Sequence, residues 1–217
     1  MDDPRAAVDA SPRMREIARL AVTVTLEPWS LGRADHERAH AAGLTDDDIL
    51  HTVALSAYFG HLNRIADAVG VPLDYDVTLR PPPADPTVPA FAPAPHATTR
   101  APAIELATRA ATATAIDAWT SYVFDRETPL ARADRLAIAQ WVAGWLGDRT
   151  TTVTGGDPAL RALARTVTLA PWQLTDASFA TLRAAGFDDA RLFDACVVAS
   201  TAGVVSRIAV ALGALAA

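Results

Sequence analysis

Apolar residues along this chain recur at helical spacing rather than in the strict alternation of strands. The clearest run covers residues 45–70, where the pattern is apolar on most sides of a helix. Alanine, the strongest helix former, supplies much of the apolar content elsewhere. The pattern predicts an all-α protein. The apolar positions of the run are Ile49, Leu50, Val53, Leu55, Leu62 and Ile65.

Two stretches of the chain are similar to each other, residues 20–71 and 163–214. They pair without a gap, and roughly twenty of about fifty paired positions are identical. Pro28 and Trp29, for example, meet Pro171 and Trp172. The similarity predicts an internal repeat built from a helical half-unit.

Each copy carries the same helix boundaries. A proline, Pro28 or Pro171, disfavours helix in the residue before it, so a first helix ends there. A short second helix ends at Gly43 or Gly186, the usual left-handed cap. Thr45, with an aspartate three residues later, begins a long third helix in the manner of a capping box.

The third helix of each copy contains a glycine and an arginine. Gly60 and Gly203 lie mid-helix, where glycine costs about 1 kcal/mol against alanine, so we expect close helix–helix packing there. Arg64 and Arg207 lie four residues later. We expect both to be structural and to pair with a carboxylate or a helix end.

Proline-rich sequence separates the copies and cannot form regular helix. Helical spacing resumes after it and predicts one helix over residues 109–124 and another between Pro129 and Leu146. The predicted parts are an N-terminal half-unit (1–71), a strap (72–101) and a fuller unit (102–217).

Composition excludes several classes of function. The net charge of −6 argues against a nucleic-acid partner. The acidic N-terminus lacks the apolar region of a secretory signal, and residues 192–217 fit a buried core helix better than a membrane span. One cysteine, Cys196, excludes an internal disulfide. We therefore expect a cytoplasmic protein without a membrane partner or a cofactor.

Residues 41–49 and 57–70 resemble the alkylhydroperoxidase-like and carboxymuconolactone decarboxylase-like family. In that family an Ala-Ala-Gly turn precedes a helix that ends in a Phe-Asn-x-x-Asn-Arg type of sequence. Asn63 and Arg64 match this ending, whereas Gly60 replaces its first asparagine. The middle of the chain, residues 119–138, resembles the stretch before the family's reactive helix. The resemblance implies an alkylhydroperoxidase-like bundle and a homo-oligomer.

The same resemblance implies that the family's thiol chemistry has been lost. The family uses two cysteines, a histidine and a glutamate to reduce peroxides. When the sequences are aligned through Gly147, these groups are all replaced. Cys196 lies on a different helix and has no second thiol to resolve a sulfenic acid, so we expect a buried apolar role for it. The glutamate position is Leu136, the cysteine positions are Asp148 and Thr151, and the histidine position is Gly155.

Histidines are concentrated in the first copy. His51, Tyr58 and His61 lie near one another around a largely apolar helix, and in the second copy Asp194, Thr201 and Val204 replace them. They are candidate catalytic residues for an acid–base reaction on a small organic acid or lactone. The alternative is that they make surface or interface hydrogen bonds.

Two further histidines, His36 and His40, belong to a His-Glu-x-x-His-x-x-Gly-x-x-Asp pattern that ends at Asp46. Histidines at this spacing can face one zinc ion. The sequence context is wrong for a metalloprotease, because no sheet is predicted and no methionine follows Met14. Gly43 and Asp46 also have counterparts in the second copy. We therefore expect no metal here.

Three functional hypotheses follow. The first is a family member without thiol chemistry that acts through binding or assembly as a homo-oligomer. The second is a cysteine-independent enzyme that uses the first copy's histidines on a small organic ligand. The third is a metalloprotein at His36 and His40. Trp119, Trp141 and Trp145 fit either a helix–helix interface or the core.

Overall fold

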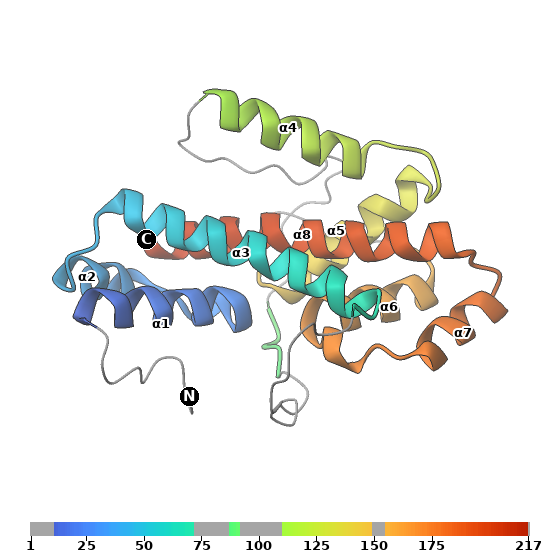
Figure 1. The fold of residues 1–217 in the computed structure, drawn as a ribbon, viewed down its shortest axis with the longest axis horizontal. Coiled ribbons are helices and arrows are strands. Elements are labelled where there is room, and N and C mark those ends of the chain that lie inside the picture. The colour runs from blue at the N-terminus through green and yellow to red at the C-terminus, as the bar shows by residue number, and fades with distance from the viewer. Residues whose placement is uncertain (1–10, 72–86, 92–109, 149–154, 217) are drawn as a thin grey trace.

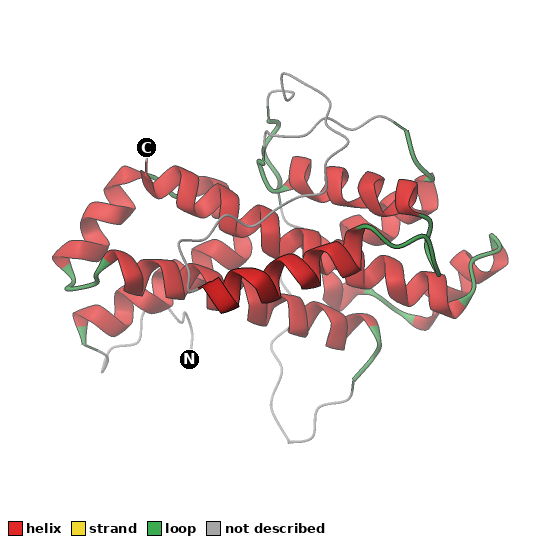
Figure 2. Cartoon of the chain, turned by 90° about the horizontal axis from the view of Figure 1, so that it is seen from above, coloured by secondary structure: helices red, strands yellow, loops and turns green. Residues whose placement is uncertain are grey.

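The computed structural model describes residues 11–71, 87–91, 110–148 and 155–216. Every regular element in these ranges is a helix, which confirms the all-α prediction (Figures 1 and 2). The N-terminal part contains α1 (Pro12–Leu26), η2 (Pro28–Ser30), α2 (Arg33–Ala41) and α3 (Asp46–Ala68). The rest contains α4 (Ala110–Phe124), α5 (Arg132–Trp145), α6 (Pro158–Leu169), η3 (Pro171–Gln173), α7 (Asp176–Ala184) and α8 (Asp189–Ala216).

The succession α1–η2–α2–α3 has the same order of elements as α6–η3–α7–α8. The backbone turns alike after the first helix of each, with φ −146° and ψ 58° at Glu27 and φ −147° and ψ 57° at Ala170. The short helices end at glycines of positive φ, +86° at Gly43 and +93° at Gly186. Proline disfavours the helical conformation in the residue before it, and glycine adopts positive φ at little cost, so both features agree with the Pro-Trp and Ala-Ala-Gly sequences.

Local signals place the helix starts. Thr45 accepts a hydrogen bond from the amide of Asp48, and the Asp48 carboxylate accepts one from the amide of Thr45, so the predicted capping box begins α3. Asp188 directly precedes α8 and accepts a bond from the amide of Arg191. The helices predicted over residues 109–124 and between Pro129 and Leu146 correspond to α4 and α5.

Helices α3 and α8 pack side by side along the length of the molecule (Figure 1). Two groups of buried apolar side chains surround them. One group joins α1, α2 and α3 to the C-terminal part of α8, and the other joins α5, α6 and α7 to its N-terminal part. Helix α8 therefore belongs to both cores. The predicted strap lies largely outside the described residues, and the part of it that is described, residues 87–91, is not helical.

Helix α8 is long and apolar enough to span a membrane by length and composition, but 78% of its apolar window is buried inside the protein. Trp141 is likewise a buried core residue, while Trp119 and Trp145 are partly buried against the core.

Candidate functional site

One face of α3 exposes large apolar side chains to solvent. Four of them follow one another at helical spacing, and each is between 43% and 58% exposed. Such a row is unusual on a helix that otherwise packs in the core, because single exposed apolar residues are normally scattered. We call it the α3 apolar face: Leu55, Tyr58, Phe59 and Leu62.

The corresponding face of α8 is buried. Val198, Thr201, Ala202 and Val205 pair in sequence with the four residues of the α3 apolar face, and none is more than 1% exposed. Helix α5 packs against α8, and its buried side chains share a core with Val198, Ala202 and Val205. In the first copy, the α3 apolar face meets the ring of Trp119 on α4, whose centroid lies 6.2 Å from that of Tyr58, and its four residues stay between 43% and 58% exposed.

A buried ion pair fixes the start of α5 to α8. Asp194 of α8 accepts hydrogen bonds from Arg135, Arg126 and the amide of Leu130, in the loop before α5 and its first turns. Arg135 is fully buried and also donates to three main-chain carbonyls of this region. The residue that pairs with Asp194 in the first copy is His51, which is exposed.

The structure brings two of the three predicted acid–base residues together. The His61 and Tyr58 rings stack with centroids 6.3 Å apart, and both meet the ring of Trp119 from α4. The Nδ1 of His61 lies 2.8 Å from the Oγ of Ser200 on α8. His51 does not join this cluster, because its Nδ1 lies 2.6 Å from the main-chain oxygen of Asp47 at the solvent-exposed start of α3.

Burial disfavours protonation of His61. Desolvation lowers the pKa of the imidazole, a hydrogen bond with Ser200 partly opposes this, and the nearby charge of Arg64 lowers the pKa further. The neutral ring therefore dominates at neutral pH. Val204 of the second copy pairs in sequence with His61, and Ala57 of the first copy pairs with Ser200, so the mirrored pair of residues on α8 and α3 is apolar.

Arg64 and Arg207 cap the first helix of the opposite copy. The Nε of Arg64 donates to the oxygen of Thr168 at the end of α6, and the Nε of Arg207 donates to the oxygen of Thr25 at the end of α1. Arg207 also donates to Thr168. Both arginines were expected to pair with a carboxylate or a helix end, and these hydrogen bonds are to helix ends. Asn63, the other family match, is exposed.

The prediction that Gly60 and Gly203 allow close helix–helix packing was wrong. A Cβ at either position would lie 2.7 Å from the Nη1 of the arginine four residues later, and no atom of a neighbouring helix lies as near. Each Nη1 donates to the glycine's own carbonyl. The glycines therefore make room for the buried guanidinium groups rather than for another helix.

His36, His40 and Asp46 converge at the corner between α2 and α3. The Nε2 atoms of both histidines lie 2.9 Å from the same Asp46 oxygen and 3.1 Å from each other. These hydrogen bonds hold the pKa of Asp46 below its ordinary value, so the carboxylate is charged at neutral pH. In the second copy Arg183 and Asp189 occupy the places of His40 and Asp46, and they form an ion pair of 2.6 Å.

The positions aligned with the family's thiol site carry no redox group. Leu136 is partly buried on α5, Asp148 is buried and Gly155 is exposed, while Thr151 lies outside the described residues. Cys196 is 1% exposed in the core, and burial raises the pKa of its thiol to about 12. A thiol with this pKa supplies almost no thiolate at neutral pH.

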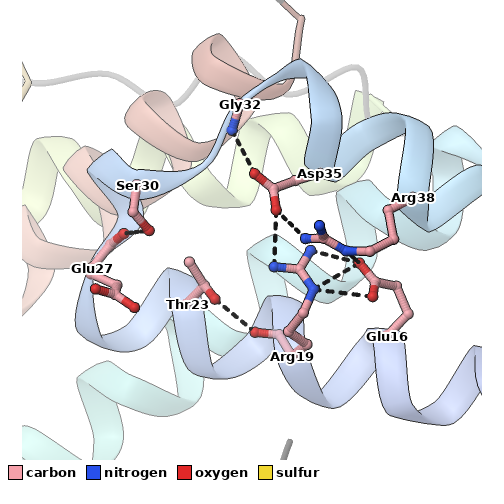
Figure 3. A network of polar contacts seen from close by, with 8 residues as sticks. All are labelled: Glu16, Arg19, Thr23, Glu27, Ser30, Gly32, Asp35 and Arg38. Carbon is pink, nitrogen blue, oxygen red and sulfur yellow. Dashed lines mark hydrogen bonds and ion pairs between the residues drawn. The ribbon is translucent and has the colours of Figure 1, made fainter.

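Sequence reasoning missed a charged groove of about 420 Å³ between α1 and α2. Figure 3 shows its network, in which Arg19 and Arg38 each pair with both Glu16 and Asp35. Its charges neutralise one another, so the groove offers no unpaired cation or anion from this set. Comparing the copies could have found it, because Ala159, Ala162, Ser178 and Thr181 replace the four charged residues in the second.

Comparison with known proteins adds no relative to this description, since no family model, curated protein or solved structure matches the chain.

Proposed function

We propose that this protein is a self-associating binding or assembly protein without thiol redox activity, in which the α3 apolar face contacts a second copy of the chain. It would be a divergent relative of the alkylhydroperoxidase-like and carboxymuconolactone decarboxylase-like proteins. The motifs around Gly43 and Arg64 support that relationship. The buried Cys196 supports the absence of peroxide reduction.

The observation that carries the proposal is the contrast between α3 and α8. Positions that α5 covers on α8 are occupied on α3 by larger apolar side chains that face solvent. Exposing Leu55, Tyr58, Phe59 and Leu62 is unfavourable by about 25 cal/mol for each Å² of apolar surface. Aromatic residues grouped in this way are typical of the centres of protein interfaces.

A second copy is the occupant that the chain itself favours. Within one chain, the equivalent face of α8 is covered by a helix of the same chain, α5. Helix α5 is already packed there, whereas the α3 of another copy presents the same four half-exposed apolar residues. Two α3 helices can pair about a twofold axis, so that the same residues contribute from both subunits.

The test measures the molar mass of the full chain by size-exclusion chromatography with light scattering over a range of concentrations. The expected mass is that of a dimer or a higher oligomer built from dimers. Phe59→Glu should shift the protein towards monomer, because it buries a charge at the interface centre. Phe193→Glu is the matched control, since Phe193 is also half-exposed on a long helix but lies off this face.

Circular dichroism should show the same helix content for both variants. A wild-type monomer at all concentrations would contradict the proposal, as would an oligomer that Phe59→Glu leaves intact.

A second candidate function is acid–base catalysis at His61. The favouring observation is a neutral, buried imidazole beside Tyr58, whose side chain is 45% exposed and reaches solvent. A neutral histidine near solvent can accept a proton from a bound small acid or lactone. Turnover of a panel of small lactones should then disappear in His61→Asn and persist in His51→Ala. Turnover that survives His61→Asn would exclude this role.

A further inference from the structure

The corner between α2 and α3 has the composition and geometry of a metal site. His36 and His40 lie one helical turn apart on α2, and Asp46 is the first residue of α3. One ligand atom from each residue lies within 4.8 Å of the others. Two imidazoles and a carboxylate are a donor set that Zn²⁺ prefers when a fourth position is left open to water or another ligand.

Hydrogen bonding alone cannot satisfy the three contacts. A hydrogen bond between the two Nε2 atoms requires that one of them lacks a proton, and that nitrogen then turns a lone pair towards the charged Asp46 oxygen. If both nitrogens carry protons, both donate to Asp46, but the 3.1 Å contact between them joins two donors. One divalent cation can accept lone pairs from all three atoms at once.

The distances require little rearrangement. With metal–ligand bonds of about 2.0–2.2 Å, tetrahedral ligand atoms lie roughly 3.4 Å apart. The observed separations of 2.9, 2.9 and 3.1 Å are shorter by a few tenths of an ångström. The side chains of His36 and His40 are 34% and 41% exposed, so small ring movements are free to occur.

At the corresponding corner of the second copy, a cationic side chain lies beside the aspartate. There the guanidinium of Arg183 pairs with Asp189, the counterpart of Asp46. The first copy has His40 in place of that arginine and adds His36 in place of Phe179. Two imidazoles thus stand around the carboxylate in the first copy where the second copy has one guanidinium.

We propose that His36, His40 and Asp46 bind one Zn²⁺ ion, which joins the end of α2 to the start of α3. The ion takes the role that the Arg183 guanidinium has in the second copy. Glu37, which would have to activate a metal-bound water in a protease, is paired with Arg33 on the exposed side of α2. The site therefore binds metal without the general base of a zinc hydrolase.

The experiment titrates the chelator-treated full chain with zinc chloride by calorimetry, and with cobalt chloride by visible absorption. We expect one ion per chain and the intense absorption of four-coordinate cobalt. His40→Arg, His36→Phe and Asp46→Asn should each weaken binding by more than the roughly 10–100-fold that loss of an outer-shell partner costs. His51→Ala removes a neighbouring exposed imidazole outside the cluster and should bind as tightly as wild type.

His40→Arg and His36→Phe restore the residues of the second copy, so both should fold, and Asp46→Asn keeps the side-chain shape. The midpoint of thermal unfolding should rise with zinc in wild type and His51→Ala but not in these three variants. Absence of zinc and cobalt binding in wild type would overturn the proposal. Binding that persists unchanged in both His40→Arg and Asp46→Asn would overturn it equally, because the ion would then lie elsewhere.

Discussion

Helices α3 and α8 have similar sequences, and each follows the same succession of helix, 3-10 turn and short helix, yet their surroundings differ. The N-terminal part of α8 is covered by α5, and a buried aspartate, Asp194, fixes the loop before α5 to it. The matching part of α3 exposes large apolar side chains, and the matching residue is the exposed His51. A face that α8 uses to complete its own core is thus exposed on α3. The comparison teaches that a partner helix, rather than the helix sequence alone, decides whether such a face is core or surface.

The copies differ in chemistry as well as in packing. The first copy carries the His36–His40–Asp46 cluster, His61 and the charged groove around Glu16. Their counterparts in the second copy are an arginine–aspartate pair, a valine and small uncharged residues. Groups required for the shared helical framework appear in both copies, as Arg64 and Arg207 do. Groups found only in the first copy are therefore the better candidates for function.

The largest effect on stability is expected at Asp194, whose buried ion pair has no counterpart at the matching position of α3. Asp194→Ala leaves the fully buried Arg135 without its carboxylate, which should lower the free energy of unfolding by about 3–5 kcal/mol. His51→Ala, at the matching position of α3, should change it by less than about 0.5 kcal/mol. Urea unfolding followed by circular dichroism measures both. Equal losses would mean that the two positions are not as different as the structure indicates.

The next effect tests the reciprocal caps. Arg207→Met removes donors to both Thr25 and Thr168, whereas Arg64→Met leaves Thr168 with its bond from Arg207. We expect a loss of about 1–3 kcal/mol for Arg207→Met, since the partly buried carbonyl of Thr25 loses its side-chain donor, and a smaller loss for Arg64→Met. Chemical unfolding of the two variants checks the order, and a larger loss at Arg64 would reverse the interpretation of these contacts.

A third pair of variants tests a feature that the two copies share, the glycine that ends the short helix. Gly43 and Gly186 both have positive φ, and a Cβ on either would meet no atom within 4 Å. Alanine at each position should therefore cost about 1 kcal/mol through backbone strain alone. Thermal unfolding of Gly43→Ala and Gly186→Ala should give similar shifts. A clear difference between them would show that the two corners are not equivalent.

The smallest effect concerns pH. Because the folded-state pKa of His61 lies below that of the unfolded chain, the unfolded state takes up a proton first as the pH falls. His61 therefore contributes stability above its unfolded pKa of about 6.5 that is lost as the pH falls through the folded value. His61→Val with Ser200→Ala copies the apolar pair of the other side and should flatten this dependence between pH 7 and 5. An unchanged slope would assign the effect to other groups.

Much of the fold could be predicted from the sequence, because local signals determine helix ends. The prolines at 28 and 171 and the capping box at Thr45 fixed boundaries that the structure reproduces. The role of Gly60 could not be predicted, since it depends on where the arginine side chain folds back along its own helix. The α3 apolar face was equally hidden, because α3 and α8 are both apolar and only tertiary packing shows which face α5 covers.

The candidate site was predictable in part. Helical spacing put Tyr58 and His61 near each other, but their neighbours Ser200 and Trp119 come from distant segments that spacing does not reveal. Spacing also grouped His51 with them, although a bond to its own helix start directs it elsewhere. For His36 and His40, the turn at Gly43 brings Asp46 towards them; the glycine predicted the helix end, but not that the three side chains would meet.

The most direct test of the central claim is hydroxyl-radical footprinting of the full chain at low and high protein concentration. We expect Leu55, Tyr58, Phe59 and Leu62 to become protected from oxidation at high concentration, while the exposed Tyr122 and Phe193 react equally at both. The α3 apolar face would then be covered by a second copy, as the buried face of α8 is covered by α5. Equal oxidation of all six residues at both concentrations would contradict the account.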